Sequence, residues 1–169
     1  MQYYLKMRAL FCPLCEKSGK SSKWFKEMVH LSRHLETVHK RYFCQACTTV
    51  RSLFVQERTT YTRSDLVTHF KKGSPPTATE GPINPHPFCK FCNTPYFSND
   101  ELYAHLTGQH ASCRFCRYAD RQKYFRDNRE LLAHFRNHHF VCDHEPCRSK
   151  DDLKDLAVFD NVVDLKAHV

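Results

Sequence analysis

The cysteines and histidines of this chain follow a repeating order that suits metal binding. All ten cysteines fall into five pairs, four with two residues between the members and the last with four. Most of the twelve histidines lie at similar distances after these pairs. Thiolate sulfur and imidazole nitrogen are the ligands of tetrahedral Zn²⁺ sites in proteins. The spacing therefore predicts a row of zinc sites, whereas a disulfide framework would leave the histidines unexplained.

Five repeats result when the cysteine pairs are aligned with the histidines that follow them. The predicted ligands, in chain order, are Cys12, Cys15, His34 and His39; Cys44, Cys47, His69 and His86; Cys89, Cys92, His105 and His110; Cys113, Cys116, His134 and His139; and Cys142, Cys147 and His168. The fifth set lacks a fourth ligand before Val169, which suggests that the chain is part of a longer protein. We expect four zinc ions and an incomplete fifth site. Since protein groups fill all four positions, these sites are expected to be structural and not catalytic.

Several histidines leave an alternative open. After His69 the segment 73–85 is rich in Pro, Gly and Thr and cannot continue a helix. Either His86 returns after this loop to close the second site, or that site is incomplete; we favour His86, since incomplete structural sites are uncommon. In the fourth repeat His138 competes with His139, and His139 keeps the spacing of the other repeats. We interpret His30 and His144 as surface residues.

Apolar spacing supports the same repeats independently of the ligands. A leucine lies three residues before the first histidine of every repeat, and an aromatic residue lies six before that leucine in four of them. Tyr61 of the second repeat is one place closer. This is the core pattern of a ββα zinc finger, with the cysteines on a short hairpin and the histidines on a helix. Ser98 with Glu101, and Asp127 with Glu130, resemble capping boxes at helix starts. The predicted fold is a small zinc-stabilised α+β array of non-standard C2H2 ββα fingers.

The expected finger boundaries leave little chain between neighbours. We predict the first finger at 1–40, the second at 41–88 with its Pro/Gly-rich loop at 73–85, the third at 86–110, the fourth at 111–139 and the fifth at 140–169. Two residues separate consecutive sites at the last three junctions, and Lys40 to Phe43 form the first. Linkers this short prevent consecutive helices from following a DNA major groove. They predict direct packing of neighbouring fingers through Phe88, Phe140 and Val141.

The charge distribution points to a polyanionic partner. The net charge is +9 over residues 1–72, +2 over 73–141 and −3 over 142–169. Basic residues mixed with aromatic ones suit structured RNA or single strands. The candidate RNA contacts are Lys17, Lys20, Lys23, Lys26, Lys40, Arg41, Arg51, Arg58, Lys71, Lys72, Arg114, Arg117, Arg121 and Lys123. Acidic residues are the most frequent class at the helix positions that read bases in DNA-binding fingers, so we do not expect sequence-specific DNA binding.

Four fragments resemble one family. They are "HPFCKFC", "NDELYAHL", "CRFCRYADRQKYFRDNRELLAHFRNHHFVC" and "DLKAH", and they are similar to the ribosome-associated quality-control ubiquitin ligases of the zinc finger protein 598 type. The resemblance runs from "FCPLC" to "DLKAH" and is strongest over residues 86–141. It implies a ribosome- and RNA-binding module that recognises stalled or collided ribosomes and promotes ubiquitination of small-subunit ribosomal proteins.

The resemblance also implies partners and a location. The partners are the small ribosomal subunit, ribosomal RNA or messenger RNA, and a ubiquitin-conjugating enzyme bound by an amino-terminal RING; the location is cytoplasmic and ribosome-associated. We expect no membrane partner. The fingers use all ten cysteines, so we expect this segment alone to lack ligase activity. Two other functions stay open: a C2H2 DNA-binding transcription factor, and a protein-interaction array that binds no nucleic acid.

Overall fold

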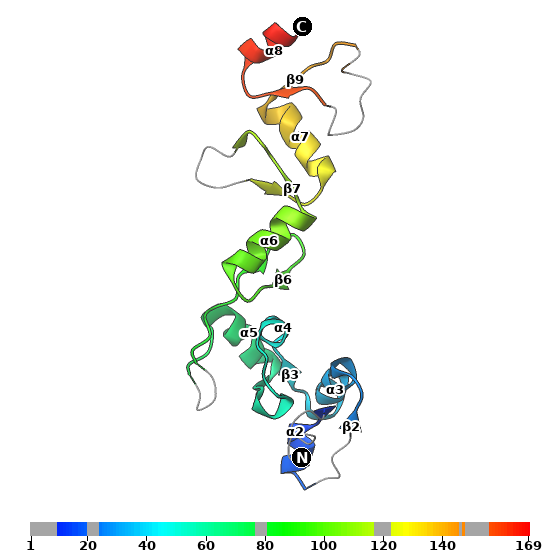
Figure 1. Ribbon diagram of the computed structural model, residues 1–169, viewed down its shortest axis with the longest axis vertical. Helices are drawn as coiled ribbons and strands as arrows, with labels where there is room; N and C mark the ends of the chain where they lie inside the picture. Colours follow the sequence, from blue (N-terminus) through cyan, green and yellow to red (C-terminus); the bar gives the residue numbers. More distant parts are fainter. Residues whose placement is uncertain (1–9, 20–23, 77–80, 117–122, 146, 148–155) are drawn as a thin grey trace. The chain divides into compact units, whose positions relative to one another are not determined.

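The computed structural model describes residues 10–19, 24–76, 81–116, 123–145, 147 and 156–169. Short antiparallel hairpins alternate with helices along this part of the chain (Figure 1). The chain divides into two compact units, residues 1–99 and 100–169. The expected fold class, tandem ββα zinc fingers with short linkers, is confirmed. None of the described helices has the length and apolar character needed to cross a membrane.

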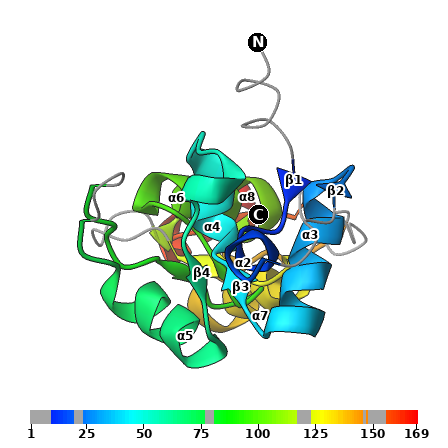
Figure 2. The same ribbon diagram turned by 90° about the horizontal axis from the view of Figure 1, so that it is seen from below.

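The first finger is a hairpin and a helix joined by a cysteine turn. Strand β1 (Leu10–Phe11) pairs with β2 (Trp24–Phe25), and the short helix α2 (Pro13–Lys17) begins directly after Cys12. Pro13 suits the first turn of a helix, where its missing N–H is not needed. Helix α3 (Met28–His34) packs against this hairpin (Figure 2) and continues as the π-helix η1 (Leu35–His39).

The second finger carries extra helical turns between its two strands. Strand β3 (Tyr42–Phe43) pairs with β4 (Thr60–Tyr61), and α4 (Gln45–Val50) and the 3₁₀-helix η2 (Val55–Glu57) lie between them. This insertion forms helical turns and leaves the two strands short. The reason is local: the Arg58 guanidinium donates to the carbonyl oxygens of Thr48, Arg51 and Leu53, which folds the insertion back on itself.

Helix α5 (Arg63–Lys72) ends at a glycine that begins the long loop of the second finger. Gly73 has φ +74°, and a Cβ added there would lie 1.9 Å from the carbonyl oxygen of Ile83. Only glycine tolerates this backbone and this close approach. Ser74 and Ile83 exchange two backbone hydrogen bonds of 2.9 Å, which closes the base of the loop. The chain thus returns towards α5, where the backbone N–H of His86 donates to Phe70.

The remaining fingers repeat the hairpin–helix order. Strand β5 (Phe88–Cys89) pairs with β6 (Thr94–Pro95), and α6 (Asn99–Gln109) follows. Strand β7 (Ala111–Ser112) pairs with β8 (Tyr124–Phe125) ahead of α7 (Asn128–His138). Strand β9 (Phe140–Val141) pairs with β10 (Val158–Phe159) ahead of α8 (Val162–His168). The predicted start of α7 is confirmed at its cap, because Asp127 accepts hydrogen bonds from the backbone N–H groups of Arg129 and Glu130.

Neighbouring fingers share their small cores. In the first unit, Val55 of the second finger is buried in one cluster with Leu31 and Leu35 of the first. In the second unit, Val158 of the fifth finger is buried with Leu131 and Phe135 of the fourth. A unit of about 30 residues buries too little apolar surface to fold on its own. Each of these two pairs of fingers therefore gains a larger core than one finger could form.

Candidate metal centres

The structure brings every predicted ligand into a cluster. The clusters are Cys12, Cys15, His34 and His39; Cys44, Cys47, His69 and His86; Cys89, Cys92, His105 and His110; Cys113, Cys116, His134 and His139; and Cys142, Cys147 and His168. Within each cluster all candidate ligand atoms lie within 4.8 Å of one another. Four clusters are complete Cys2His2 sets and the fifth has three members, as expected from the spacing.

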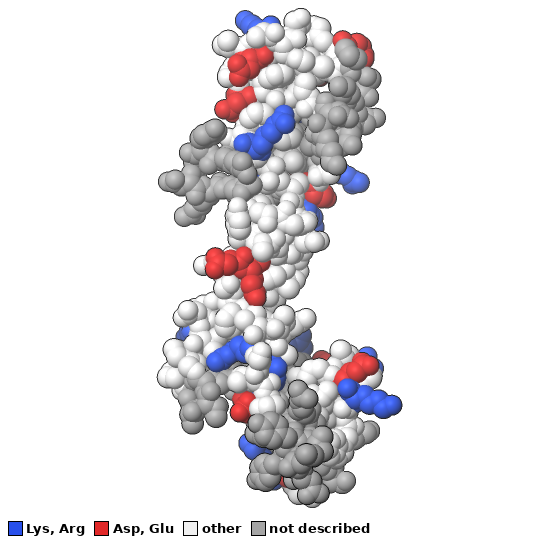
Figure 3. Space-filling model, viewed as in Figure 1, with Lys and Arg blue, Asp and Glu red and all other residues white. Residues whose placement is uncertain are grey.

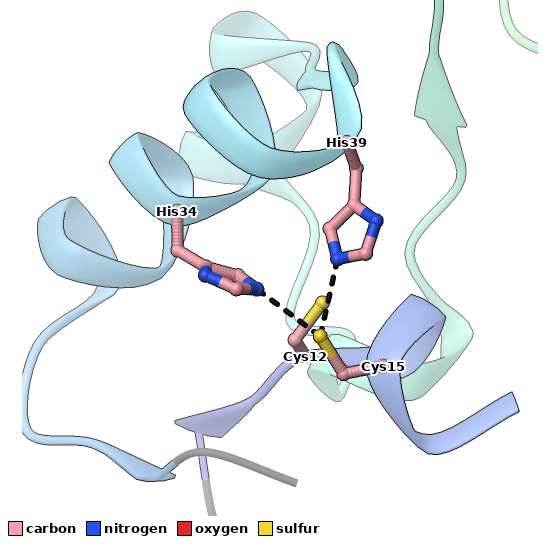
Figure 4. Close-up of side chains that lie close together, drawn as sticks. All are labelled: Cys12, Cys15, His34 and His39. Atoms are coloured by element: carbon pink, nitrogen blue, oxygen red, sulfur yellow. Dashed lines mark hydrogen bonds between the residues drawn. The ribbon is translucent and has the colours of Figure 1, made fainter. Parts of the chain in front are cut away.

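The spacing of these atoms fits Zn²⁺. In tetrahedral coordination, Zn–S bonds of about 2.3 Å and Zn–N bonds of about 2.0 Å place sulfur and nitrogen about 3.5 Å apart. In the first cluster, the Cys15 sulfur lies 3.3 Å from Nε2 of His34 and 3.1 Å from Nε2 of His39 (Figure 4). The second and fourth clusters give sulfur–nitrogen distances of 3.3–3.5 Å. Zinc bound in these clusters would crosslink each hairpin to its helix.

The two histidines of the first, third and fourth fingers are five positions apart, and an α-helix does not present such residues on one face. At 3.6 residues per turn, positions i and i+5 point about 140° apart. The first finger solves this with the π-helix η1, whose i→i+5 hydrogen bonds widen the turn that carries His39. The third and fourth fingers solve it by ending the helix first: α6 stops at Gln109 and α7 at His138. His110 and His139 then lie just beyond their helices.

The geometry of the second cluster favours His86 as its fourth ligand over an incomplete site. Nε2 of His86 lies 3.0 Å from Nε2 of His69 and within 3.5 Å of both cysteine sulfurs. The bridge between Ser74 and Ile83 shortens the path between the two histidines. The Ser74 hydroxyl also lies 2.7 Å from Nδ1 of His69, so the loop orients one ligand as well as returning the other. Such outer contacts commonly fix the ring of a ligand histidine.

The other ambiguous histidines lie outside the clusters. His138 is exposed and its ring lies 5.0 Å from that of His134, whereas Nε2 of His139 faces the Cys113 sulfur at 3.3 Å. His30 and His144 are also exposed.

In the fifth cluster, the Cys147 sulfur lies 3.2 Å from Nε2 of His168.

Local electrostatics favour the zinc-binding ionisation state at several ligands and oppose it at His86 and at Cys116, where burial raises the pKa of the thiol. The pKa of Cys44 is lowered to about 4, chiefly by a hydrogen bond from Cys47 and further by His86, against the opposing effect of burial. Thiolate is the form of cysteine that binds metal. Burial lowers the pKa of His134 to about 4, which keeps its imidazole neutral and able to coordinate. Burial also lowers the pKa of His105 and of His139. For His86, burial acts in the same sense, but the hydrogen bond and charge of Cys44 outweigh it and the pKa is raised.

In four of the five fingers, the aromatic residue of the core pattern has a role that its spacing did not reveal. It stacks on or tilts against the first ligand histidine of its own finger: Phe25 lies 5.1 Å from His34, Tyr61 lies 4.6 Å from His69, Phe125 lies 4.6 Å from His134 and Phe159 lies 5.0 Å from His168. The aromatic-x5-Leu-x2-His pattern identified these residues as core. The ring contact with a ligand needed the folded helix and hairpin together.

The structure separates the candidate RNA contacts into two groups. Lys17, Lys26, Lys40, Lys71, Lys72 and Lys123 are exposed. Arg41, Arg58 and Arg114 contact the chain itself, although Arg114 is also exposed. The Arg58 guanidinium donates to three carbonyl oxygens. Arg41 forms an ion pair with Asp65 at 3.9 Å. Arg114 donates to the carbonyl oxygen of Val158, and its guanidinium lies 4.8 Å from the Phe115 ring centroid. Arg51 is half-buried beside Arg58. Lys20, Lys23, Arg117 and Arg121 lie outside the described residues.

Charge is dispersed over the visible surface. On the face drawn in Figure 3, the described basic and acidic side chains form small separate groups, without one continuous field of either sign. An electrostatic contact with a polyanion would therefore draw on several separate lysines.

Comparison with known proteins gives a consistent result. The chain is 35% identical over 158 residues to E3 ubiquitin-protein ligase ZNF598 of Homo sapiens, which covers 93% of this chain and 16% of that protein. It is 37% identical over 139 residues to the Mus musculus protein of the same name, covering 82% of this chain and 14% of that protein. It is 31% identical over 168 residues to E3 ubiquitin-protein ligase HEL2 of Saccharomyces cerevisiae, covering 98% of this chain and 25% of that protein. The chain thus spans a quarter or less of these relatives. No family model and no solved structure matches it.

Proposed function

This chain belongs with the ZNF598 and HEL2 E3 ubiquitin-protein ligases as a homologue of one segment of them, and from that premise we propose that it is their ribosome- and RNA-binding finger module. In this proposal the fingers hold stalled or collided ribosomes in the cytoplasm while a RING elsewhere in the protein acts on small-subunit ribosomal proteins. The RING would engage the ubiquitin-conjugating enzyme. The zinc ions in the fingers would be structural, because each complete cluster fills all four positions with protein ligands.

The observation that carries the proposal is a difference between the described arginines and lysines of the candidate set in the contacts that they make. Three described arginines of the candidate set, Arg41, Arg58 and Arg114, contact the chain itself, whereas the described lysines of the set are exposed. Lysines that stay exposed on a strongly basic segment suit contact with phosphates, whose affinity depends on counterion release. Trp24 adds a second feature, since its side chain is 64% exposed on β2, two residues before Lys26. An exposed aromatic ring beside a lysine can stack on an unpaired base.

The first test measures binding of the chain to purified small ribosomal subunits, with and without nuclease, over a range of salt concentrations. Binding should weaken steeply with salt and with nuclease treatment. Replacing Lys71 and Lys72 by alanine should lower the affinity and make the salt dependence shallower by about one unit for each phosphate that is no longer bound. The matched control is Lys166→Ala in the acidic fifth finger, an exposed lysine that should leave binding unchanged. Equal weakening of binding in the two variants would contradict the proposal.

The second test connects binding to the ligase reaction. In the full-length protein, the Lys71→Ala/Lys72→Ala variant should lose ubiquitination of ribosomal proteins and keep ubiquitination of itself, since the fingers position the substrate and the RING performs transfer. Loss of both reactions would place these lysines in the ligase machinery instead.

Two outcomes would replace the proposal by another function. Selection of one duplex sequence at physiological salt would indicate a DNA-binding transcription factor. Ribosome binding that resists nuclease and is insensitive to salt would indicate a protein-interaction array.

A further inference from the structure

The last ligand histidine in three successive fingers turns its outer nitrogen to the finger that follows. Nδ1 of His86 lies 3.1 Å from the carbonyl oxygen of Tyr96 in the third finger. Nδ1 of His110 lies 3.0 Å from the carbonyl oxygen of Arg126 in the fourth. Nδ1 of His139 lies 3.4 Å from Oδ1 of Asp160 in the fifth. Carbonyl and carboxylate oxygens accept hydrogen bonds, so each Nδ1 carries the proton and each Nε2 keeps its lone pair for metal.

The strand registers explain why this contact recurs. Ala111 pairs with Phe125, so extending the ladder by one residue sets His110 opposite Arg126. Phe140 pairs with Phe159, which sets His139 opposite Asp160 in the same way. In the third finger Phe88 pairs with Pro95, and His86 contacts the carbonyl oxygen of Tyr96, the residue after Pro95. A linker of two residues places the last histidine of one finger at the start of the hairpin of the next. The linker length therefore produces the contact.

The first junction lacks this geometry. Four residues separate His39 from Cys44, and Tyr42 pairs with Tyr61. The register then sets Arg41 beside the start of α5, where it pairs with Asp65 at 3.9 Å. Within the described part of the chain, His39 makes its polar contact through Nε2, to the Cys15 sulfur, and no partner of its Nδ1 is found.

The contact at the fourth cluster is made by a side chain. The His139 side chain is 6% exposed, and its Nδ1 is buried and has no hydrogen-bond partner among the described residues; the polar atom that it faces is Oδ1 of Asp160, at 3.4 Å. Asp160 approaches this nitrogen from the turn ahead of α8 and is itself 57% exposed. A carboxylate behind a ligand histidine holds the ring in the coordinating tautomer and raises the basicity of the nitrogen that binds metal.

We propose that zinc binding at the second, third and fourth clusters is coupled to the folding of the next finger through the polar contact that the outer nitrogen of the last ligand histidine makes with that finger, with Asp160 as the positioning residue for the fourth cluster. A finger that loses its fold withdraws the acceptor from the cluster before it. Metal loading is then directional: each of these clusters depends on the finger that follows it more than on the finger that precedes it. This coupling is independent of any ribosome or RNA partner.

The first experiment replaces Asp160 in the whole chain and measures zinc affinity at each site. Chelator competition, followed through the histidine ring resonances of each finger, resolves the sites. Asp160→Ala should weaken zinc binding at the fourth cluster by about 10–100-fold, the usual cost of removing an outer-shell partner, and leave the fifth cluster unchanged. Asp160→Asn retains an acceptor oxygen and should restore most of the affinity.

The matched control is Asp164→Ala. It removes another acid near the start of α8, and it disturbs the helix more, because Asp164 bonds to the capping residue Asn161. It does not contact His139. A fall in zinc affinity at the fourth cluster as large in Asp164→Ala as in Asp160→Ala would show that only the fold of the fifth finger matters, and would overturn the role of Asp160. An unchanged affinity in Asp160→Ala would overturn it as well.

The second experiment tests direction at the third cluster, where the acceptor belongs to the main chain. Cys113→Ser unfolds the fourth finger and removes the Arg126 carbonyl from His110. Cys44→Ser unfolds the second finger, which precedes the third. Zinc binding at the third cluster should weaken about 10–100-fold in Cys113→Ser and much less in Cys44→Ser. Equal effects of the two variants would contradict directional coupling.

Discussion

The junction between the first and second fingers and the junction between the fourth and fifth use the same apolar solution but differ at the metal. In each, a valine from the following finger fills the core of the preceding one: Val55 is 5% exposed and Val158 is 4% exposed. At the later junction His139 also contacts Asp160, whereas at the first the linker residue Arg41 pairs with Asp65 of the second finger and does not contact a ligand histidine through that pair. The difference follows from two additional linker residues. Apolar packing therefore tolerates variation in linker length, whereas the contact to a ligand histidine requires one length.

Removing a ligand should have the largest effect and should break the later junction as a whole. Cys113→Ser takes away a thiolate from a structural site whose zinc contributes roughly 10–16 kcal/mol of apparent binding energy. We expect the fourth finger to unfold and the fifth to lose amide protection with it, because Val158 loses its core. Hydrogen exchange followed by NMR measures this residue by residue. Full protection over residues 156–168 in the variant would show that the shared core is unimportant.

The long loop of the second finger offers the next largest effect. Gly73→Ala places a Cβ against the carbonyl oxygen of Ile83 and strains a backbone with φ +74°. The backbone strain alone costs about 1–3 kcal/mol, and the clash adds to it. The bridge between Ser74 and Ile83 should open, and His86 should bind zinc less well. Thermal unfolding and zinc affinity of the second finger are the measurements.

The matched control for this glycine lies in the second unit. Gly108 is in α6, and a Cβ added there meets nothing within 4 Å. Gly108→Ala should leave zinc binding unchanged and stabilise the helix by about 0.5–1 kcal/mol. A destabilisation of similar size in the two variants would show that Gly73 is not special.

Substitution of Val55 and of Val158 tests the difference between the two junctions directly. Val55→Ala and Val158→Ala each remove a buried branched side chain, and each should cost about 1.5–3 kcal/mol in the free energy of unfolding of the finger that receives it. Only Val158→Ala should also weaken zinc at the preceding cluster, because β10 leads directly to Asp160. Chemical denaturation combined with zinc titration separates the two quantities. Weaker zinc binding at the first cluster in Val55→Ala, in proportion to that at the fourth in Val158→Ala, would remove the distinction between the junctions.

Helix caps should give the smallest effect. Thr62 accepts a hydrogen bond from the backbone N–H of Asp65 at the start of α5, and Thr62→Ala should cost about 1 kcal/mol. Thr62→Asn keeps a capping side chain and should recover most of this stability. Zinc affinity at the second cluster should change little in either variant, since the cap lies a full helix turn or more before His69. A large fall in zinc affinity in Thr62→Ala would show that α5 depends on its cap more than on its metal.

Ligand types, their spacing and the apolar pattern were readable from the sequence because each is local. A cysteine pair, an aromatic, a leucine and a histidine at fixed intervals permit few folds other than a ββα finger, and the expected clusters formed accordingly. The same local logic identified the cap at Asp127. It could not distinguish Arg58, which folds an insertion, from an exposed lysine, since both are simply basic in sequence.

Contacts between fingers were decided only by the tertiary structure. Val55 fills the core of a neighbour, His86 returns through a bridge between Ser74 and Ile83, and Asp160 meets His139 across a strand register. The first and third contacts join residues from different repeats, and the second lies in a loop of the second repeat alone, whereas a repeat pattern describes only what is the same within each repeat. The physical reason is that a finger too small to satisfy its own core and its own ligand histidine must take the missing partners from the next one.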